Sequence, residues 1–348
     1  TKWQSYNYEL LTTIAYFSVE TNATGDLTNL HGWPATDLIN KAHSNGVEVL
    51  LTVTLFDKSK IESLLSNKNY RDRLINNLNS QVIDAGADGV NIDFESFPSS
   101  QKENLVTFVK DLRSTLRNSI ENAQVTLATP AVDWENAWDF NALAIESDGL
   151  FIMGYDYHWK ESTNAGPVSP LIGGTYNVTN TLNTYLSTTN NNYEKLILGI
   201  PYYGYNWPTS SDEKGAKTTN SGTAAYFSEA ETKALSYGKI WDSSSETPWF
   251  KYQNSIWNQT WYDDSLSISK KYDLALSKNL GGIGIWALGY DEGYDELWNL
   301  LKDKIAAKMP PATPVNFNII NLGNESILID FSSSENATSF EVNRVFKQ

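Results

Sequence analysis

The chain has 348 residues, of which 41% are hydrophobic, and it carries a formal net charge of −15. This length can bury a large core, either in one big domain or in a big domain joined to a small one. The acidic balance excludes nucleic acid and anionic membranes as partners, because both bind basic surfaces. The absence of cysteine excludes a disulfide framework and thiolate chemistry, and we expect no metal site.

The sequence contains no membrane span and no visible targeting segment. No run of about 18 apolar residues occurs, and no signal peptide can be recognised. The chain begins at Thr1 rather than at methionine, which is compatible with removal of an upstream segment. Its composition fits a cytosolic protein and an exported bacterial one equally well. The 12 Trp and 19 Tyr residues are explained mostly by packing, and platforms that stack on sugar rings are the sharper alternative.

Apolar runs typical of strands alternate along the chain with longer amphipathic segments. Helices are expected at 70–85, 101–118 and 266–279, and the apolar residues of the second follow helical spacing. Near-continuous apolar strands separated by helices indicate a parallel sheet with a covered face. The strand-like runs are 10–18, 47–56, 87–95, 124–131, 148–157, 195–205 and 281–291.

Seven such strands in one large domain predict an α/β fold, a (β/α)₈ TIM barrel. A doubly wound sheet is the alternative, but no Gly-x-Gly-x-x-Gly turn follows an early strand. The long segment before the last strand predicts a small α+β insertion at about 207–265, between strands 7 and 8. Near 306–314 the chain becomes a proline-rich linker, "AAKMPPATP". Short strand-like runs follow it, so we expect a barrel domain over 1–309 and a β-rich tail over 310–348.

The stretch "ADGVNIDFESFP" (87–98) places carboxylates in what otherwise reads as a buried strand. Burying a charge is costly, so the position needs a reason. Alternate side chains of a strand point to opposite faces, which puts Asn91, Asp93 and Glu95 on one face and the apolar residues between them on the other. In a barrel the polar set would face the axis, with Glu95 at the carboxyl end, where barrel active sites lie.

Two close carboxylates on this face predict acid–base chemistry. Residues two apart on a strand are roughly 6.6 Å apart at Cα, and two close carboxylates cannot both ionise cheaply. One therefore holds a proton near neutral pH, as a general acid must. The alternatives are a surface strand edge and a calcium site built from oxygen ligands, although the loop spacing of an EF-hand is absent.

Several stretches of the chain resemble glycoside hydrolase family 18, the chitinase family. "DGVNIDFE" is similar to the family signature Asp-Gly-x-Asp-x-Asp-x-Glu, and the resemblance runs from about residue 10 to 305. Two stretches of the insertion, "TPWFKY" and "WYDDSLSISKKYDLALSKNLGG", are most similar to bacterial members that include spore-cortex and peptidoglycan-acting enzymes. Five further stretches resemble the third, fifth, sixth, seventh and eighth barrel strands in order: "VLLTVTL", "VTLATPA", "FIMGYDYHW", "LGIPYYGYNW" and "GGIGIWALGYDEG".

The chain departs from the family pattern at two places. Asn91 stands where the signature usually has its first inward Asp, and an Asn cannot share a proton with Asp93. The run "LLTTIAYFS" (10–18) resembles the second barrel strand, so the family's first strand, with its aromatic sugar contact, is expected upstream of Thr1. The tail over 310–348 is too short for a complete sandwich and resembles a truncated fibronectin type III segment.

The resemblance implies hydrolysis of β-1,4 linkages next to N-acetylglucosamine, in chitin or its oligosaccharides, by a retaining mechanism assisted by the substrate's own acetamido group. It implies that Glu95 is the general acid and base and that Asp93 holds the acetamido N–H and stabilises the developing positive charge. Tyr155 would donate to the acetamido carbonyl. Asn91 would support Asp93.

The resemblance also implies the substrate-binding positions. Trp286 would form the floor under the sugar ring, Asp156 would orient the sugar, and Tyr203 would belong to the cleft wall. Met153 is grouped with them, although methionine at such a place is typically a core residue. The remaining tryptophans that could line the cleft are left unassigned: Trp134, Trp138, Trp159, Trp207 and Trp261.

We expect a secreted or cell-surface monomer that acts on N-acetylglucosamine-containing chains, without a cofactor. A peptidoglycan or N-glycan-core N-acetylglucosaminidase uses the same chemistry and remains an alternative. A non-catalytic chitin-binding lectin on the same barrel is another, but such proteins usually lose the acid, and Glu95 and Asp93 are both present.

Overall fold

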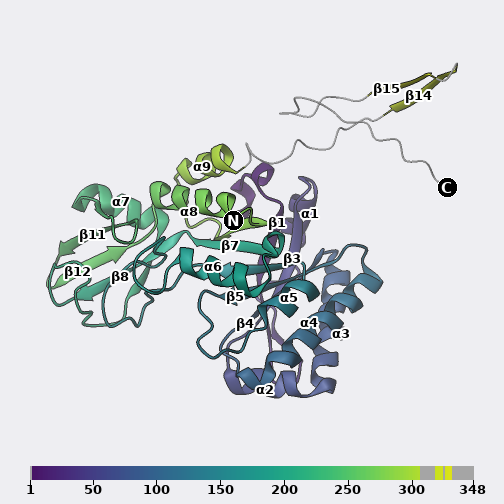
Figure 1. Cartoon of the computed structure of the whole chain (residues 1–348), viewed down its shortest axis with the longest axis horizontal. Coiled ribbons are helices and arrows are strands. Elements are labelled where there is room, and N and C mark those ends of the chain that lie inside the picture. Colours follow the sequence, from purple (N-terminus) through teal and green to yellow (C-terminus); the bar gives the residue numbers. More distant parts are fainter. Residues whose placement is uncertain (1, 306–317, 324–325, 331–348) are drawn as a thin grey trace.

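The computed structural model describes residues 2–305, 318–323 and 326–330 (Figure 1). Its largest sheet has eight strands in the order β13-β7-β6-β5-β4-β3-β1-β2. All neighbours are parallel except β2 (Leu27–Asn29), which pairs antiparallel with the end of β1. The parallel strands are β1 (Thr13–Thr21), β3 (Glu48–Leu55), β4 (Gly89–Phe94), β5 (Gln124–Pro130), β6 (Gly149–Met153), β7 (Leu196–Pro201) and β13 (Gly282–Trp286).

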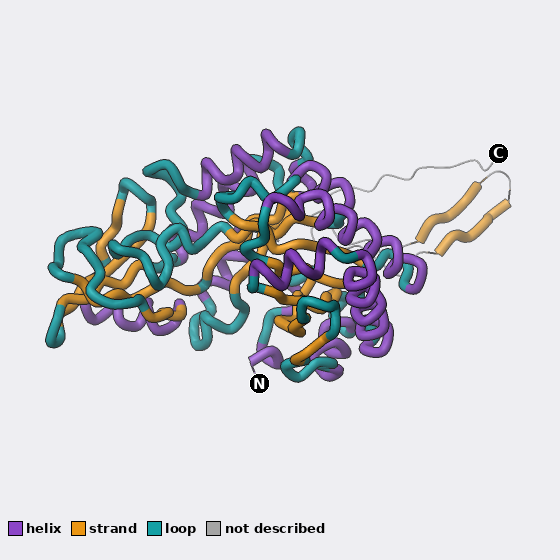
Figure 2. The backbone as a smooth tube through the Cα atoms, turned by 90° about the horizontal axis from the view of Figure 1, so that it is seen from below, coloured by secondary structure: helices purple, strands orange, loops and turns teal. Residues whose placement is uncertain are grey.

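Helices follow most of these strands and cover the outer face of the sheet (Figure 2), which is the arrangement of a TIM barrel. The expected α/β barrel is therefore confirmed. The barrel helices are α1 (Thr36–His43), α2 (Lys58–Ser66), α3 (Lys68–Ala85), α4 (Lys102–Ser119), α5 (Phe140–Glu146), α6 (Val178–Thr188), α8 (Ser265–Ser277) and α9 (Glu296–Lys304). None of the helices in the described ranges is long and apolar enough to cross a membrane.

The main core lies between the sheet and these helices. Helix α4 turns its apolar stripe inward, and Leu105, Phe108, Val109 and Leu112 are each at most 1% exposed. Phe94 at the end of β4 stacks on Phe108, with ring centroids 5.9 Å apart. Burial of this outer face is what turns the polar face of β4 towards the barrel axis.

The seam between β1 and β13 is the place where the expected first strand is absent. In the described part of the chain these two strands are not paired with each other by hydrogen bonds, and no other strand lies between them. Residues 2–11 cross there in two short 3₁₀ turns, Lys2–Ser5 and Tyr8–Leu10. The Tyr6 hydroxyl donates to the carbonyl of Leu288 at 3.1 Å and so ties this segment to the loop after β13.

A second sheet of five antiparallel strands forms a lobe beside the barrel, at the left of Figure 1. Its order is β10-β11-β12-β8-β9, and its core contains Trp249 and Trp261, stacked 5.0 Å apart, together with the fully buried Trp207. Its elements are β8 (Tyr203–Thr209), β9 (Thr223–Tyr226), α7 (Phe227–Tyr237), β10 (Ile240–Asp242), β11 (Thr247–Gln253) and β12 (Trp257–Trp261).

One expected strand is wrong, because the chain leaves the barrel for the lobe partway along it. The run 195–205 is two strands, because β7 ends at Pro201 and β8 begins at Tyr203. The break falls where the Tyr202 amide donates to the carbonyl of Trp286 at 2.8 Å. From Tyr203 onward the chain pairs with β9, and from Tyr205 onward also with β12, instead of a barrel strand. The antiparallel sheet therefore starts before the expected insertion boundary at about 207.

The tail contains one described hairpin, in which β14 (Asn318–Gly323) pairs antiparallel with β15 (Ser326–Asp330). The rest of the predicted linker and tail over 310–348 lies outside the described residues.

Candidate active site

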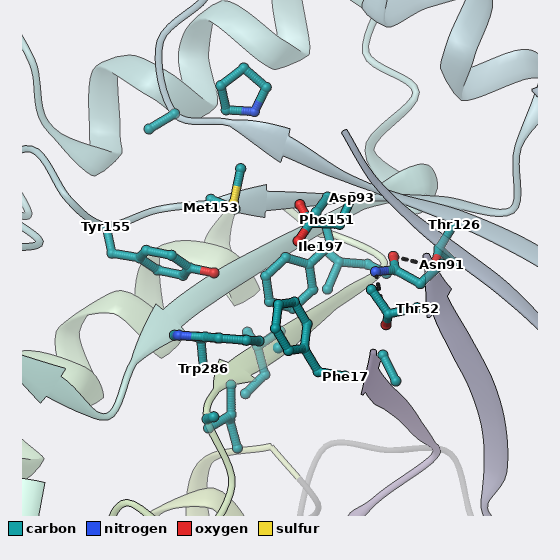
Figure 3. Close-up of a pocket in the computed structure, with 18 of the residues that line it drawn as sticks. Phe17, Thr52, Asn91, Asp93, Thr126, Phe151, Met153, Tyr155, Ile197 and Trp286 are labelled. Atoms are coloured by element: carbon teal, nitrogen blue, oxygen red, sulfur yellow. Dashed lines mark hydrogen bonds between the residues drawn. The ribbon is translucent and has the colours of Figure 1, made fainter. Parts of the chain in front are cut away.

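A cavity of about 1530 Å³ occupies the barrel interior, and residues at the carboxyl ends of the strands line it (Figure 3). Its wall continues down to Gly281 and Ile305, near the amino end of β13. Tyr205 and Tyr226 of the lobe line it as well. The structure brings all of the predicted site residues to this one cavity: Asn91, Asp93, Glu95, Met153, Tyr155, Asp156, Tyr203 and Trp286.

Strand β4 carries the polar residues into the cavity. Gly89, at its start, lies so close to β5 that an added Cβ would be 2.0 Å from the carbonyl oxygen of Gln124. Glycine at this position therefore lets the two strands approach. Further along, Asn91 is fixed on both sides: its Oδ1 accepts from the Thr126 hydroxyl at 2.9 Å, and its Nδ2 donates to the Thr52 hydroxyl at 3.4 Å (Figure 3).

Asp93 is a buried carboxyl group that has no ion-pair partner among the described residues. It is 6% exposed, and its Oδ1 has no hydrogen-bond partner in the described part of the chain. Burial, followed by the nearby charge of Glu95, raises its pKa to about 8. Asp93 therefore holds a proton near neutral pH, as expected for one of two close carboxylates.

Glu95 is the first residue after β4, and its amide still donates to the carbonyl of Leu55 at 3.2 Å. Its half-buried side chain makes no hydrogen bond within the described residues. Burial and the charge of Asp156 raise the pKa of its carboxyl group. Such a group is protonated over a wider pH range than a solvated Glu and is free to reach a ligand, which are the properties of a general acid.

The end of β6 and the turn after it supply another part of the wall. Tyr155 follows Met153 in a tight turn, in which the Tyr155 amide donates to the Met153 carbonyl at 2.8 Å. Burial, with the charges of Asp93, Asp156 and Glu95, raises the pKa of Tyr155 well above its usual value. Its hydroxyl therefore stays protonated and can donate a hydrogen bond into the cavity that it faces in Figure 3.

Asp156 and Tyr203 are joined at the edge of the cavity. The Tyr203 hydroxyl donates to Oδ1 of Asp156 at 2.5 Å, and the exposed Asp156 adopts a left-handed backbone conformation with φ of 58°. The ring of Tyr203 also meets that of Tyr155 edge-on, with centroids 6.0 Å apart. This contact couples the lobe, which carries Tyr203, to the turn after β6, which carries Tyr155.

An aromatic floor closes the site. Trp286 ends β13, and Phe17 of β1 meets it edge-on, with ring centroids 4.8 Å apart (Figure 3). Met153 is half-buried and lines the cavity, so it is a wall residue as well as a packing residue. The floor can stack on an apolar sugar face, while the carboxyl and hydroxyl groups above it can bind an amide and exchange a proton.

Sequence reasoning named Trp134 only as a tryptophan that could line the cleft and did not name Phe17 or Tyr176, and all three line the cavity. All three are aromatic, and each is at least 46% exposed. The high aromatic content of the sequence indicated that some aromatic residues could bind sugar. Which ones line the cavity depends on how the chain folds, and local sequence does not show this. Of the other unassigned tryptophans, Trp138 lines the cavity, whereas Trp207 and Trp261 are buried in the lobe.

Known proteins resemble this chain over most of its length. The protein named sporulation-specific glycosylase YdhD, from Bacillus subtilis, is 27% identical over 298 residues, which cover 80% of this chain and 67% of that protein. Di-N-acetylchitobiase of Homo sapiens is 26% identical over 339 residues, covering 87% and 81%. The structure of a family 18 chitinase from Cycas revoluta in complex with (GlcNAc)3 matches with a TM-score of 0.78 at 22% identity, covers 87% of this chain and 95% of that one, and shows the likeness of fold.

The family assignment rests on a match that covers all the barrel strands and most of the chain. The family model described as "Glycosyl hydrolases family 18" matches residues 1–291. The match ends before the tail, and the comparisons give no support for a fibronectin type III segment there. The chain belongs to glycosyl hydrolase family 18 and is a glycoside hydrolase.

Proposed function

We propose that the chain hydrolyses β-1,4 linkages next to N-acetylglucosamine, in chitin or its oligosaccharides, with Glu95 as general acid and base. The observation that carries this proposal is that one cavity holds Glu95 and the buried Asp93, and within the described residues Glu95 makes no side-chain hydrogen bond and Asp93 has no positive partner. Relatives named di-N-acetylchitobiase support chitin-type substrates.

In the first step, the Glu95 carboxyl group gives its proton to the glycosidic oxygen, and the bond from this oxygen to the anomeric carbon breaks. The acetamido carbonyl oxygen of the same sugar forms a bond to that carbon and gives an oxazolinium ion. Asp93 accepts a hydrogen bond from the acetamido N–H, and as the positive charge of the ring develops it favours release of the Asp93 proton to solvent, which leaves the carboxylate beside that charge. The Tyr155 hydroxyl donates to the acetamido oxygen.

In the second step, the Glu95 carboxylate takes a proton from water while the water oxygen bonds to the anomeric carbon and the oxazolinium ring opens. Glu95 regains its proton, and two displacements at one carbon leave its configuration retained. Trp286 supports the sugar from below, and the Asp156–Tyr203 pair orients it. Asn91, held by two threonines, keeps the wall beside Asp93 polar and uncharged.

A peptidoglycan N-acetylglucosaminidase is the second candidate, because the Bacillus subtilis relative is named a sporulation-specific glycosylase. Its glycan also has β-1,4-linked N-acetylglucosamine, so the reacting site would be unchanged. The two candidates differ in what must fit beyond the reacting sugar.

Three substrates test the proposal in one experiment: chitohexaose, cellohexaose and purified peptidoglycan, with products sized by mass spectrometry. We expect cleavage of chitohexaose and none of cellohexaose, which has the same linkage but a hydroxyl group at C2 and so lacks the internal nucleophile. Cleavage of peptidoglycan but not of chitohexaose would contradict the chitin substrate and support the second candidate, a peptidoglycan N-acetylglucosaminidase. Efficient cleavage of cellohexaose would contradict the mechanism.

A further inference from the structure

Asp291 is a buried carboxyl group that the proposed mechanism does not use. It lies in the loop between β13 and α9 and is 3% exposed. Its Oδ2 has no hydrogen-bond partner within the described residues, and the residue does not line the cavity. A carboxyl group without a full set of partners is costly to bury, so its place in this loop needs a reason.

The carboxyl group closes a tight turn in the loop from its inner side. Burial raises the pKa of Asp291, and hydrogen bonds from the backbone amides of Asp291 itself and of Gly289 act against that effect. Gly289 has φ of 85°, in the left-handed region that favours glycine. The Asp291 side chain therefore holds the chain in a turn soon after it leaves β13.

This turn lies against two buried tyrosines of the barrel. Tyr202, between β7 and β8, and Tyr272 of α8 are each at most 2% exposed, and their hydroxyl oxygens are 3.2 Å apart. Burial is the main cause that raises the pKa of both hydroxyl groups, and the nearby charge of Asp291 adds to it. The Tyr202 amide also donates to the carbonyl of Trp286 at 2.8 Å. The turn and the end of β13 are therefore supported by the same residue, Tyr202.

The same loop is also attached to the lobe. The ring of Tyr290 stacks on that of Tyr226 of β9, with centroids 4.1 Å apart, and both residues line the cavity. The Tyr294 amide donates to the Asp291 carbonyl at 2.9 Å, and the Tyr294 hydroxyl lies 2.8 Å from that of Thr232 on α7. The loop thus joins the floor of the cavity to its lobe wall.

The place of the Trp286 ring depends on this loop. Trp286 is half-buried and lies at the cavity in Figure 3, so side-chain packing holds the ring only in part. Its backbone is fixed by the Tyr202 amide on one side and by the turn at Asp291 on the other. A shift of about 1 Å in a group that positions a substrate can lower the rate by about 10²-fold.

We propose that Asp291 is a positioning residue, which closes the turn after β13 from behind the cavity wall and so sets the place of the Trp286 ring under the reacting sugar. This inference rests on the proposed function, because it takes Trp286 to be the floor of the site in which Glu95 acts. Asp291 touches no reacting atom, and its effect reaches the sugar through Trp286. The alternative is that Asp291 stabilises the fold and nothing more.

Steady-state kinetics on chitohexaose separate these two roles. Asp291→Ala removes both accepting oxygens and should lower kcat by about tenfold, with less than about a threefold change in KM, because the other binding contacts remain. Asp291→Asn keeps an oxygen that can accept from the amides and should recover most of kcat. Urea unfolding checks that each variant is folded at the assay temperature. A lower stability without a lower kcat in Asp291→Ala, or no recovery in Asp291→Asn, would overturn the positioning role.

A double-mutant cycle tests the route through Trp286. In the Trp286→Ala background the ring is gone, so Asp291→Ala should lower kcat little further. Trp134→Ala is the matched comparison, because Trp134 lines the same cavity but follows β5, which β7 and β6 separate from β13. Losses at distant, independent sites multiply, so those of Asp291→Ala and Trp134→Ala should do so. Multiplied losses in both pairs would show that Asp291 does not act through Trp286.

Thr232→Val examines the loop from its lobe end and serves if Asp291→Ala does not fold. It removes the hydroxyl group that meets Tyr294 at an exposed position, so kcat should fall by a smaller factor than in Asp291→Ala, and the fall should vanish in the Trp286→Ala background. A fall that persists there would overturn the inference but leave the proposed function standing. If the wild-type protein cleaved neither chitohexaose nor peptidoglycan, the proposed function would fail and the positioning role with it.

Discussion

Asp93 shows how one residue can set a pH dependence for the whole protein. Its carboxyl group is buried, lacks a positive partner within the described residues and stands near Glu95. The family signature has a second carboxyl group two positions earlier, where this chain has Asn91. Asn91 cannot take up a proton, so the titration of this strand belongs to Asp93 and Glu95.

The raised pKa of Asp93 makes folding weaker as pH rises. Its pKa is about 8 when folded and about 3.8 without burial. Between these values the folded state binds more protons than the unfolded state, so the free energy of unfolding falls as pH increases. Asp93→Asn removes this cost. The variant should be more stable than the wild type at pH 8.5, by on the order of a few kcal/mol, with the smallest difference at pH 4.

Urea unfolding at pH 4, 6 and 8.5 measures this difference. Asp84→Asn, at an exposed position on α3, is the control and should change little at any pH. A stability gap between Asp93→Asn and the wild type that is the same at all three pH values would show that Asp93 is not held protonated by the fold.

At the scale of elements, the sequence was most informative where local pattern and burial agree. The expected helix over 101–118 is α4 (Lys102–Ser119), because its apolar stripe faces the sheet throughout. The break after Pro201 was missed, because residues on both sides of it are apolar and aromatic. What separates β7 from β8 is the pairing of β8 with β12, some fifty positions later, and local pattern carries no such information.

The candidate site divides in the same way. Glu95 could be placed on the polar face of its strand because strand alternation fixes the direction of the residues around it, whereas Tyr155, in the turn after β6, was named only through the family resemblance. Trp134 and Tyr176 could not be placed in this way, because they stand on loops whose positions depend on contacts such as that of Thr181 with Ala131. The tail over 310–348 gave a prediction that the described residues do not test.

Close packing around the Phe151 ring requires glycine on a barrel strand, because a larger residue would overlap the ring. An added Cβ at Gly284 of β13 would lie 2.1 Å from the Phe151 ring. Gly284→Ala should therefore destabilise the protein by about 1–3 kcal/mol through overpacking. Gly282→Ala on the same strand is the matched control, because its nearest contact would be 3.9 Å away.

Thermal unfolding of these variants tests the packing argument. Adding Phe151→Leu to Gly284→Ala should restore part of the lost stability, because a smaller side chain leaves space for the methyl group. If Gly284→Ala unfolds at the same temperature as Gly282→Ala, Phe151 is not confined as the structure indicates.

At the scale of the whole molecule, barrel and lobe act on one cavity. The barrel supplies the carboxyl groups and Trp286, while the lobe supplies Tyr203, which holds Asp156, and further wall residues such as Tyr205. The same architecture that buries Asp93 leaves Glu95 free at the mouth. We therefore propose that this cavity is a catalytic site in which Glu95 transfers the proton.

Steady-state kinetics of Glu95→Gln on a chitotriose reporter substrate test that claim most directly. The substitution keeps the shape of the side chain and removes the transferable proton, so turnover should fall by about 10²–10⁴ while binding of chitooligosaccharide, measured by calorimetry, persists. Glu103→Gln, at an exposed position on α4, should behave as the wild type. Near-normal turnover by Glu95→Gln would contradict the account and leave the carboxylates of β4 with a role in binding or structure alone.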